Sequence, residues 1–393
     1  MTRLLLCRSR QHYSFGGEPK LLPLFRAKDP DLRRWPLSVI IRRAESFCSR
    51  FNLRAPILLA PMAGACPPAL SIAVANAGGL GACGVLLMKP DQIAAWASEV
   101  RANSNGAFQL NIWIPDPLPK RDTAKETRVR EFLQRWGPPV AAEAGDAAPL
   151  DFAQQCEAML EVRPPVISSV MGLFPPVFVQ KMRERGIAWF ATVTTVGEAR
   201  AAEAAGANAI VAQGAEAGGH RGCFDAAAAQ RKQVGLFALL PAVSDAIRVP
   251  VVAAGGIADG RGVAAALTLG ASAVQIGTGF LRCPEAKIHP VWADALAQTA
   301  PEDTMVSRVF SGRAGRSIAN DYVLAATGAD APEPAPYPVQ RGLTAAMRAA
   351  AQTEGDISRM QAWAGQSAVL ARAEPAAAIM RRVWEEGAKT LLG

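Results

Sequence analysis

Eight short apolar runs recur between residues 57 and 281, and they constrain the fold more than any other feature of the chain. Continuous apolar runs bounded by glycine are typical of strands buried on both faces of a parallel sheet. The runs are Ile57–Met62, Leu80–Val85, Phe108–Trp113, Val166–Met171, Ala188–Val193, Ala209–Gly214, Val249–Ile257 and Ala273–Leu281. With helical patterns between them, eight such βα units predict an α/β fold of the (β/α)8 TIM-barrel type.

The segments between the runs fit this architecture. Pro176–Arg185 follows the fourth run and has a helical pattern. After the fifth run, Thr195 and Glu198 have the spacing of a capping box at a helix start, and Gly206 is placed to end that helix. Asp259–Gly270, between the last two runs, is rich in Ala and Leu. An open doubly wound sheet is the alternative, and it is disfavoured because no G-x-G-x-x-G motif opens the first helix after a strand.

Glycines follow the seventh and eighth runs. Gly255 and Gly256 close one run, and Gly277-Thr278-Gly279 lies at the end of the other. In (β/α)8 barrels, the loops after strands seven and eight commonly form a phosphate site from backbone N–H groups. We therefore expect these two loops to bind a phosphate group together.

The stretch Ala209–Gly222 carries the strongest indication of chemistry. Its apolar run ends at Gln213 and passes into a glycine-rich loop that presents His220, one of three histidines in the chain. Glycines let a backbone approach a ligand closely, and a histidine pKa lies near working pH, as a general base requires. The alternative is a tight strand-to-helix turn with a solvated histidine. We expect Glu216 to anchor the loop by bonding backbone N–H groups, and a carboxylate that points into the site is the alternative. We expect Cys223 to be a small packing residue, with a reactive thiol as the minor alternative.

Together these motifs resemble the nitronate monooxygenases, formerly called 2-nitropropane dioxygenases, which are FMN-dependent barrel enzymes. The resemblance runs from about Arg54 through the eighth run, and more loosely to about Tyr322. Flavin-dependent enoyl reductases and some NADH:quinone reductases share much of the same set. The motifs are Ala60–Gly64, Gln109–Ile112, Ala212–Gly222, Ala254–Ile257 and Gln275–Thr278.

The resemblance implies FMN as the cofactor and His220 as the catalytic residue, which removes the proton α to a nitro group or orients a nitronate anion. Amide side chains suit the polar edge of a flavin ring, and the glycine loops suit its phosphate. The residues implied to contact FMN are Met62, Asn111, Gln213, Gly218, Gly256, Gln275, Ile276, Gly277 and Thr278. For Met62, an ordinary core position is an equal alternative. No metal is expected.

The implied reaction is oxidative denitrification of alkyl nitronates, propionate 3-nitronate among them, with O₂, giving a carbonyl compound and nitrite. The alternative is an FMN-dependent NAD(P)H oxidoreductase of the quinone or enoyl reductase type, and a non-catalytic FMN-binding protein is the least favoured. The expected partners are a small-molecule nitronate and O₂, with neither nucleic acid nor membrane. A homodimer is left open.

The net charge of +8 lies almost wholly at the N-terminus, where residues 1–50 hold eleven Lys and Arg against four Asp and Glu. The rest of the chain therefore lacks the basic domain that nucleic-acid binding needs. We expect residues 1–50 to be a basic extension that is disordered up to about Pro36. No apolar run reaches 18 residues, which excludes a transmembrane helix. The seven cysteines show no C-x-x-C pair, and we expect reduced thiols in a cytoplasmic protein.

Beyond this extension we expect an FMN-binding barrel over residues 51–287 and a largely helical C-terminal subdomain over residues 288–393. The insert 114–165 is too long for an ordinary connection and has a helical stretch from Thr123 to Trp136, so we expect it to contribute to a lid. The resemblance implies that the insert and the C-terminal part close over the flavin. For Gln340–Leu392, helices that only cover the barrel exterior are an equal alternative.

Overall fold

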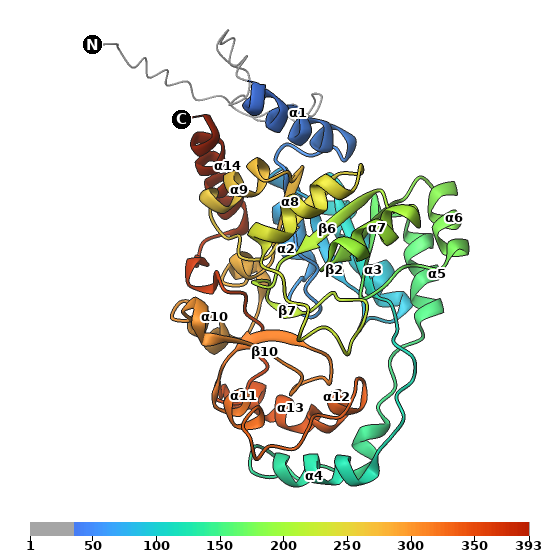
Figure 1. Cartoon of the computed structure of the whole chain (residues 1–393), viewed down its shortest axis with the longest axis vertical. Helices are drawn as coiled ribbons and strands as arrows, with labels where there is room; N and C mark the ends of the chain where they lie inside the picture. Colours follow the sequence, from blue (N-terminus) through green and yellow to red (C-terminus); the bar gives the residue numbers. More distant parts are fainter. Residues whose placement is uncertain (1–34, 393) are drawn as a thin grey trace.

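A computed structural model describes residues 35–392, in which the eight predicted strands form one barrel (Figure 1). The strands are all parallel in the order β1-β9-β8-β6-β5-β4-β3-β2, and a bridge between Leu58 and Leu80 joins β1 to β2. The prediction of a (β/α)8 barrel is confirmed. The strands are β1 (Ile57–Leu59), β2 (Gly81–Gly84), β3 (Phe108–Trp113), β4 (Val166–Val170), β5 (Ala188–Val193), β6 (Ala209–Gln213), β8 (Val251–Ala254) and β9 (Ala273–Ile276).

Two strands end earlier than their apolar runs. β1 stops at Leu59, and the next residues turn to line a cavity above the barrel. β9 stops at Ile276, because Gly277 leaves the extended conformation at φ −107° and ψ −82°. A 3₁₀ turn, η4 (Thr278–Phe280), follows. The runs therefore marked the strands correctly and overstated their lengths where the chain bends toward the site.

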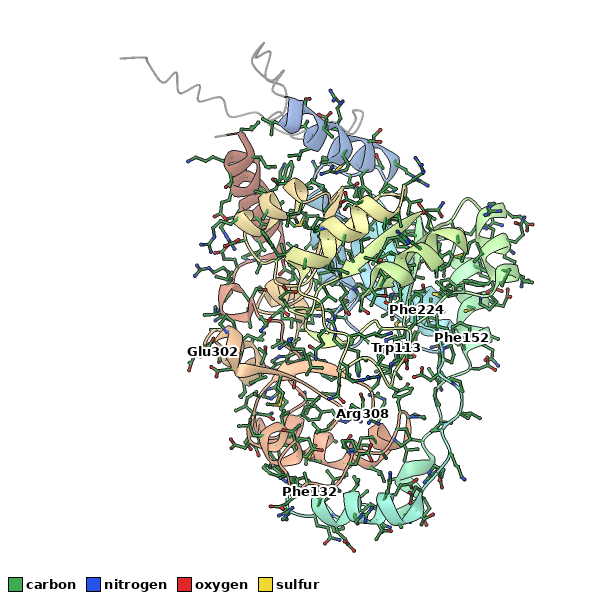
Figure 2. All side chains as sticks on the ribbon, viewed as in Figure 1. Trp113, Phe132, Phe152, Phe224, Glu302 and Arg308 are labelled. Carbon is green, nitrogen blue, oxygen red and sulfur yellow. The ribbon has the colours of Figure 1, made fainter. Side chains whose placement is uncertain are left out.

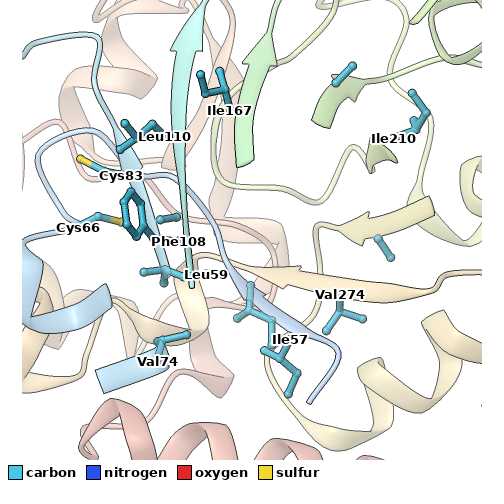
Figure 3. Packing of buried hydrophobic residues seen from close by; sticks show 14 of the residues in the cluster. Ile57, Leu59, Cys66, Val74, Cys83, Phe108, Leu110, Ile167, Ile210 and Val274 are labelled. Carbon is cyan, nitrogen blue, oxygen red and sulfur yellow. The ribbon is translucent and has the colours of Figure 1, made fainter. Parts of the chain in front are cut away.

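Side chains alternate between the two faces of each strand, as strand geometry requires. In β1, Ile57 and Leu59 pack in the core between strands and helices (Figure 3). Leu58 packs in the barrel interior. Along β6 the interior column passes from Val211 to the polar Gln213. The barrel interior is thus apolar at its N-terminal end and becomes polar where the strands end.

Helix α1 (Trp35–Arg50) covers the N-terminal end of the barrel. Phe47 and Phe51 pack against Phe190 of β5, with ring centroids 6.0 and 5.0 Å from it. Part of the predicted N-terminal extension is therefore an ordered helix that joins the barrel core. The disorder expected up to about Pro36 falls almost entirely on residues 1–34, which lie outside the described residues.

The outer layer of helices includes one from the far end of the chain. Helix α14 (Ala376–Leu392) packs against α2 and α9, so it occupies the position of the eighth barrel helix although about a hundred residues separate it from β9. The other barrel helices are α2 (Pro68–Asn76), α3 (Pro90–Asn103), α5 (Phe152–Val162), α6 (Pro176–Glu184), α7 (Val196–Ala204), α8 (Leu236–Ala246) and α9 (Gly260–Thr268).

The residues between β9 and α14 form a second lobe over the C-terminal ends of the strands (Figure 1). Helix α4 (Thr123–Leu133) of the insert joins this lobe, because its Phe132, labelled in Figure 2, belongs to the same buried hydrophobic cluster as Tyr322 and Met347. Within Gln340–Leu392, α13 lies in the lobe and α14 lies on the barrel. The lobe elements are α10 (Pro290–Leu296), β10 (Thr304–Ser307), β11 (Gly315–Ile318), α11 (Asp321–Ala326), α12 (Val339–Leu343) and α13 (Ala345–Glu354).

Residues 35–392 can be compared with two further expectations, reduced cysteines and the absence of a transmembrane helix. Six cysteines in this part of the chain are buried and form no disulfide. Burial raises the pKa of the Cys223 thiol, with Glu198 adding to the effect, which argues against a reactive thiolate there. No helix of the described residues combines the length and apolar character needed to cross a membrane.

The packing of α14 makes a prediction for stability. Trp384 of this helix is fully buried, so Trp384→Ala opens a cavity and should lower the free energy of unfolding by about 3–5 kcal/mol. Glu385→Ala, at the exposed neighbouring position, should change it by less than about 0.5 kcal/mol. Urea titrations followed by circular dichroism measure both. Similar small losses in the two variants would show that α14 is not part of the cooperative barrel core.

Candidate active site

A cavity of about 300 Å³ lies at the C-terminal ends of the barrel strands and beneath the second lobe. The structure brings every predicted site residue to it except Ile276. In β9 the side chain of Gln275 faces the cavity, so that of Ile276 faces the other way and is buried in the outer core. The predicted residues that line the cavity are Met62, Asn111, Gln213, Gly218, His220, Gly256, Gln275, Gly277 and Thr278.

The two predicted glycine loops present backbone N–H groups to the cavity. Gly255 and Gly256 adopt φ values of +112° and +69°, in the left-handed region that glycine tolerates. The N–H groups of Gly256, Gly277 and Thr278 have no acceptor within the described residues. Free N–H groups on two adjoining loops form a cradle for an anion, which is the geometry expected for a phosphate site.

A third segment of this cradle comes from the second lobe. The N–H of Gly365 donates to Thr278 Oγ1 at 3.0 Å, and the N–H of Gln366 donates to Glu216 O at 2.9 Å. A Cβ atom added to Gly218 would lie 2.5 Å from Gly365 N, so only glycine fits there. Residues 364–366 lie in the stretch 355–375, which holds no α-helix, so the expectation of a largely helical segment over Gln340–Leu392 gave no signal for them.

Two amide side chains leave opposite hydrogen-bonding groups free toward the cavity. The Nδ2 group of Asn111 donates to Ser168 O and Oγ at 3.2 and 3.0 Å, and its Oδ1 has no partner among the described residues. The Oε1 atom of Gln275 accepts from Gln109 Nε2 at 3.1 Å, and its amide nitrogen has no acceptor within residues 35–392. The cavity therefore offers an acceptor from β3 and a donor from β9.

Gln213 and Glu216 instead hold the loop that follows β6. Gln213 Nε2 donates to His220 O at 3.1 Å, and its Oε1 accepts from Gly222 N at 2.8 Å. Both carboxylate oxygens of Glu216 accept from Leu236 N, at 2.8 and 3.0 Å. The anchoring role predicted for Glu216 is confirmed.

His220 does not lie in an irregular loop as the sequence indicated. Gly219 and His220 form a short strand, β7 (Gly219–His220), which pairs antiparallel with β11 so that His220 lies opposite Gly315. The imidazole is flanked by Trp113 of β3 and Trp363 of the second lobe, with ring centroids 4.5 and 4.6 Å away. Figure 2 places Trp113 where the barrel meets the lobe. The long-range pairing could not be read from the local glycine pattern.

The electrostatic surroundings keep His220 uncharged. Burial, together with the nearby positive charges of Arg313 and Arg341, lowers the pKa of His220 to about 3. The lining residues include Arg341 and Arg348 and no Asp or Glu. His220 Nε2 lies 2.8 Å from Ser311 Oγ. The site therefore combines a neutral imidazole with a positive potential, which favours an anionic ligand.

Sequence reasoning missed the aromatic and basic residues of this site. Trp113 continues the inward-facing alternation of Gln109 and Asn111, so its position in β3 could have identified it. Tyr337 and Arg341 lie near the start of α12, and the Tyr337 ring is 5.3 Å from that of Trp113. The residues of the second lobe had no strand pattern to reveal their position.

Comparisons with known proteins agree with this site. The profile of the family described as nitronate monooxygenase matches residues 45–386. A protein of Paraburkholderia phytofirmans named nitronate monooxygenase is 40% identical over 339 residues, which is 84% of this chain and 92% of that protein. The solved nitroalkane oxidase of Streptomyces ansochromogenes is 34% identical, with a TM-score of 0.80 over 88% of this chain and 100% of that one. FabK of Thermotoga maritima is 29% identical, with a TM-score of 0.68 over 88% and 97%. The chain therefore belongs to the nitronate monooxygenase family.

Proposed function

We propose that this protein is an FMN-dependent nitronate monooxygenase that converts alkyl nitronates and O₂ to a carbonyl compound and nitrite. The observation that carries the proposal is the neutral imidazole of His220, which lines a cavity that holds two arginines and no carboxylate. Propionate 3-nitronate is one substrate that we include in this class. A neutral proton acceptor beside positive charge suits a reaction in which a nitroalkane becomes an anion.

The residues present fit FMN. The free N–H groups of Gly256, Gly277 and Thr278 suit its phosphate, and the free amide groups of Asn111 and Gln275 suit the polar edge of its ring. Met62 lines the same cavity, where a thioether can pack against an aromatic ring. When bound, FMN would supply the electron transfer from the nitronate that O₂ completes.

Arg341 and Arg348 provide the positive potential for the substrate. The described residues place no carboxylate against either guanidinium. Burial, with a further contribution from Arg341, lowers the pKa of Arg348 to about 10, so it remains charged at neutral pH. An anion that enters this cavity therefore meets two charges that the protein does not neutralise, which favours nitronates over neutral analogues.

His220 has a different task for each form of the substrate. A neutral nitroalkane must lose its α proton, and the uncharged imidazole can accept it. A preformed nitronate has already lost that proton, so His220 only orients it. The ring is held between Trp113 and Trp363, which limits it to small reorientations.

A FMN-dependent NAD(P)H oxidoreductase is the second candidate, because FabK has a similar structure. The chain carries no G-x-G-x-x-G dinucleotide motif after its first strand.

We also propose that the enzyme is cytoplasmic, since its six described cysteines are unpaired thiols, and that a homodimer is compatible with its activity.

Replacing His220 distinguishes a general base from a residue that only orients the substrate. General-base catalysis typically contributes about 10²–10⁴-fold, so His220→Asn should lose about that factor in kcat/KM for neutral nitroalkanes. The loss for preformed nitronates should be much smaller, because they need no deprotonation, and flavin content should match the unmodified protein. Steady-state oxygen consumption with both substrate forms measures the difference. Equal losses would reject the base role, and no loss on either would leave His220 a bystander.

The glycine cradle gives a test of cofactor binding. Gly256→Val forces a branched side chain into φ +69° and places its Cβ 3.3 Å from Glu216 Cβ, so we expect weak or absent FMN with a folded barrel. Gly186→Val is the matched control, because Gly186 has φ +70° and open space around it, away from the cavity. Chromatography of the released flavin identifies and quantifies it. Full FMN retention by Gly256→Val, or release of FAD from the unmodified protein, would contradict the proposal.

The lowered pKa of His220 predicts how stability depends on pH. Below about pH 6.5 the unfolded chain gains a proton at this position that the folded protein, with a pKa of about 3, does not bind. The free energy of unfolding should therefore fall by about 1.4 kcal/mol per pH unit more in the unmodified protein than in His220→Asn between about pH 6 and pH 4. Urea titrations at matched flavin content provide the comparison. Parallel pH dependences would mean that His220 titrates normally.

A further inference from the structure

His220 and Ser311 meet where three separate segments converge: the loop after β6, the turn before β11 and the insert after β3. We propose that Ser311 fixes the neutral imidazole of His220 with its proton on Nε2, so that Nδ1 accepts the substrate proton, and that Arg313 and Asp116 hold Ser311 in place. The catalytic consequence rests on the proposed function, whereas the position of the imidazole proton does not.

The hydrogen bonds at Ser311 determine the direction of its contact with His220. A hydroxyl group has one proton to donate and two lone pairs to accept with. Ser311 Oγ donates to Arg313 O at 3.1 Å and accepts from Arg313 N at 3.3 Å. No other donor reaches Arg313 O within the described residues. With its proton committed to that carbonyl, Ser311 can only accept from His220 Nε2, which lies 2.8 Å away.

The opposite tautomer leaves the buried carbonyl of Arg313 without a donor. If Nδ1 carried the proton, the Ser311 hydroxyl would have to donate to Nε2, and the carbonyl of Arg313 would lose its donor. Ser311 and Arg313 are 1% and 2% exposed, so water cannot replace that bond. A buried carbonyl without a donor is unfavourable, and the Nε2–H tautomer is therefore the stable one.

The ring orientation places the other nitrogen at the cavity. Trp113 and Trp363 flank the imidazole at interplanar angles of 69° and 58°. A flip of the ring would break its contact with Ser311. Nδ1 has no hydrogen-bond partner among the described residues and is not among their fully buried unpaired atoms. Its lone pair is thus available to a ligand in the cavity that His220 lines.

Arg313 connects the contact between Ser311 and His220 to the insert after β3. Its guanidinium pairs with Asp116 and donates to Cys223 O, while its main chain holds Ser311 through both contacts described above. Among the described residues, Asp116 is the only carboxylate that forms an ion pair with Arg313. A side chain from the insert therefore supports the turn that orients the imidazole, which makes Asp116 and Arg313 positioning residues.

The position of the imidazole proton can be observed directly. Long-range ¹H–¹⁵N correlation spectra of histidine-labelled protein distinguish the two tautomers, and His220→Asn assigns the signals among only three histidines. We expect the unmodified protein to show Nε2–H at neutral pH, and Ser311→Ala to show a mixture of tautomers. Ser317→Ala is the matched control, because Ser317 is also buried but bonds to Ile318 O. It should leave the His220 signals unchanged.

Kinetics give the second readout. Ser311→Ala should lower kcat/KM for neutral nitroalkanes by about 10- to 100-fold and affect preformed nitronates much less, with melting temperature and flavin content close to those of Ser317→Ala. Asp116→Asn should also give a mixture of tautomers, with a smaller share of the Nδ1–H form than Ser311→Ala. An Nδ1–H tautomer in the unmodified protein, or pure Nε2–H in Ser311→Ala, would overturn the role of Ser311. An unchanged spectrum in Asp116→Asn would overturn the role of the insert. Failure of the proposed function would show separately, as absent nitronate turnover in the unmodified protein.

Discussion

The pairing of β7 with β11 is the interaction on which the site depends. It joins two residues of a barrel loop to a strand of the second lobe and thereby sets the position of His220. Buried arginines reinforce it: Arg316 of β11 donates to Ala215 O at 3.0 Å, and Arg221 donates to Gly214 O at 2.7 Å. The contacts that cover the cavity are therefore the same contacts that orient the imidazole within it.

The connectivity of the second lobe explains why it can contribute to a precise site. Its chain leaves the barrel after β9 and returns to it as α14, so both ends are fixed on a packed scaffold. Gly365 from this lobe meets Thr278 from the barrel in the phosphate cradle. The proposed cofactor would thus bridge the two parts, and its binding would favour the covered arrangement over any open one.

Features of the fold and site that depend on local sequence patterns could be predicted, whereas features that depend on contacts between distant segments could not. The strands were predictable because apolar runs bounded by glycine are local signals, whereas the cavity residues Asn111 and Gln275 were implied by the resemblance to a known family. Ile276 was misplaced in the site by one residue, which is enough to reverse the face. Ser311 and Trp363 were not predictable, because only the β7–β11 pairing and the insertion of the lobe bring them to His220. The helical character of the segment that forms α14 was predicted, but its packing against α2 and α9 was not, since these partners are remote in the chain.

The central claim is that the flavin site accepts electrons from a nitronate. The most direct measurement is anaerobic mixing of the purified protein with propionate 3-nitronate and, separately, with NADH, while flavin absorbance is recorded. We expect the nitronate to bleach the flavin and NADH to leave it unchanged, because the cavity presents Arg341 and Arg348 to an anion and the chain carries no dinucleotide motif. Bleaching by NADH alone would contradict the account and assign the protein to the NAD(P)H oxidoreductases.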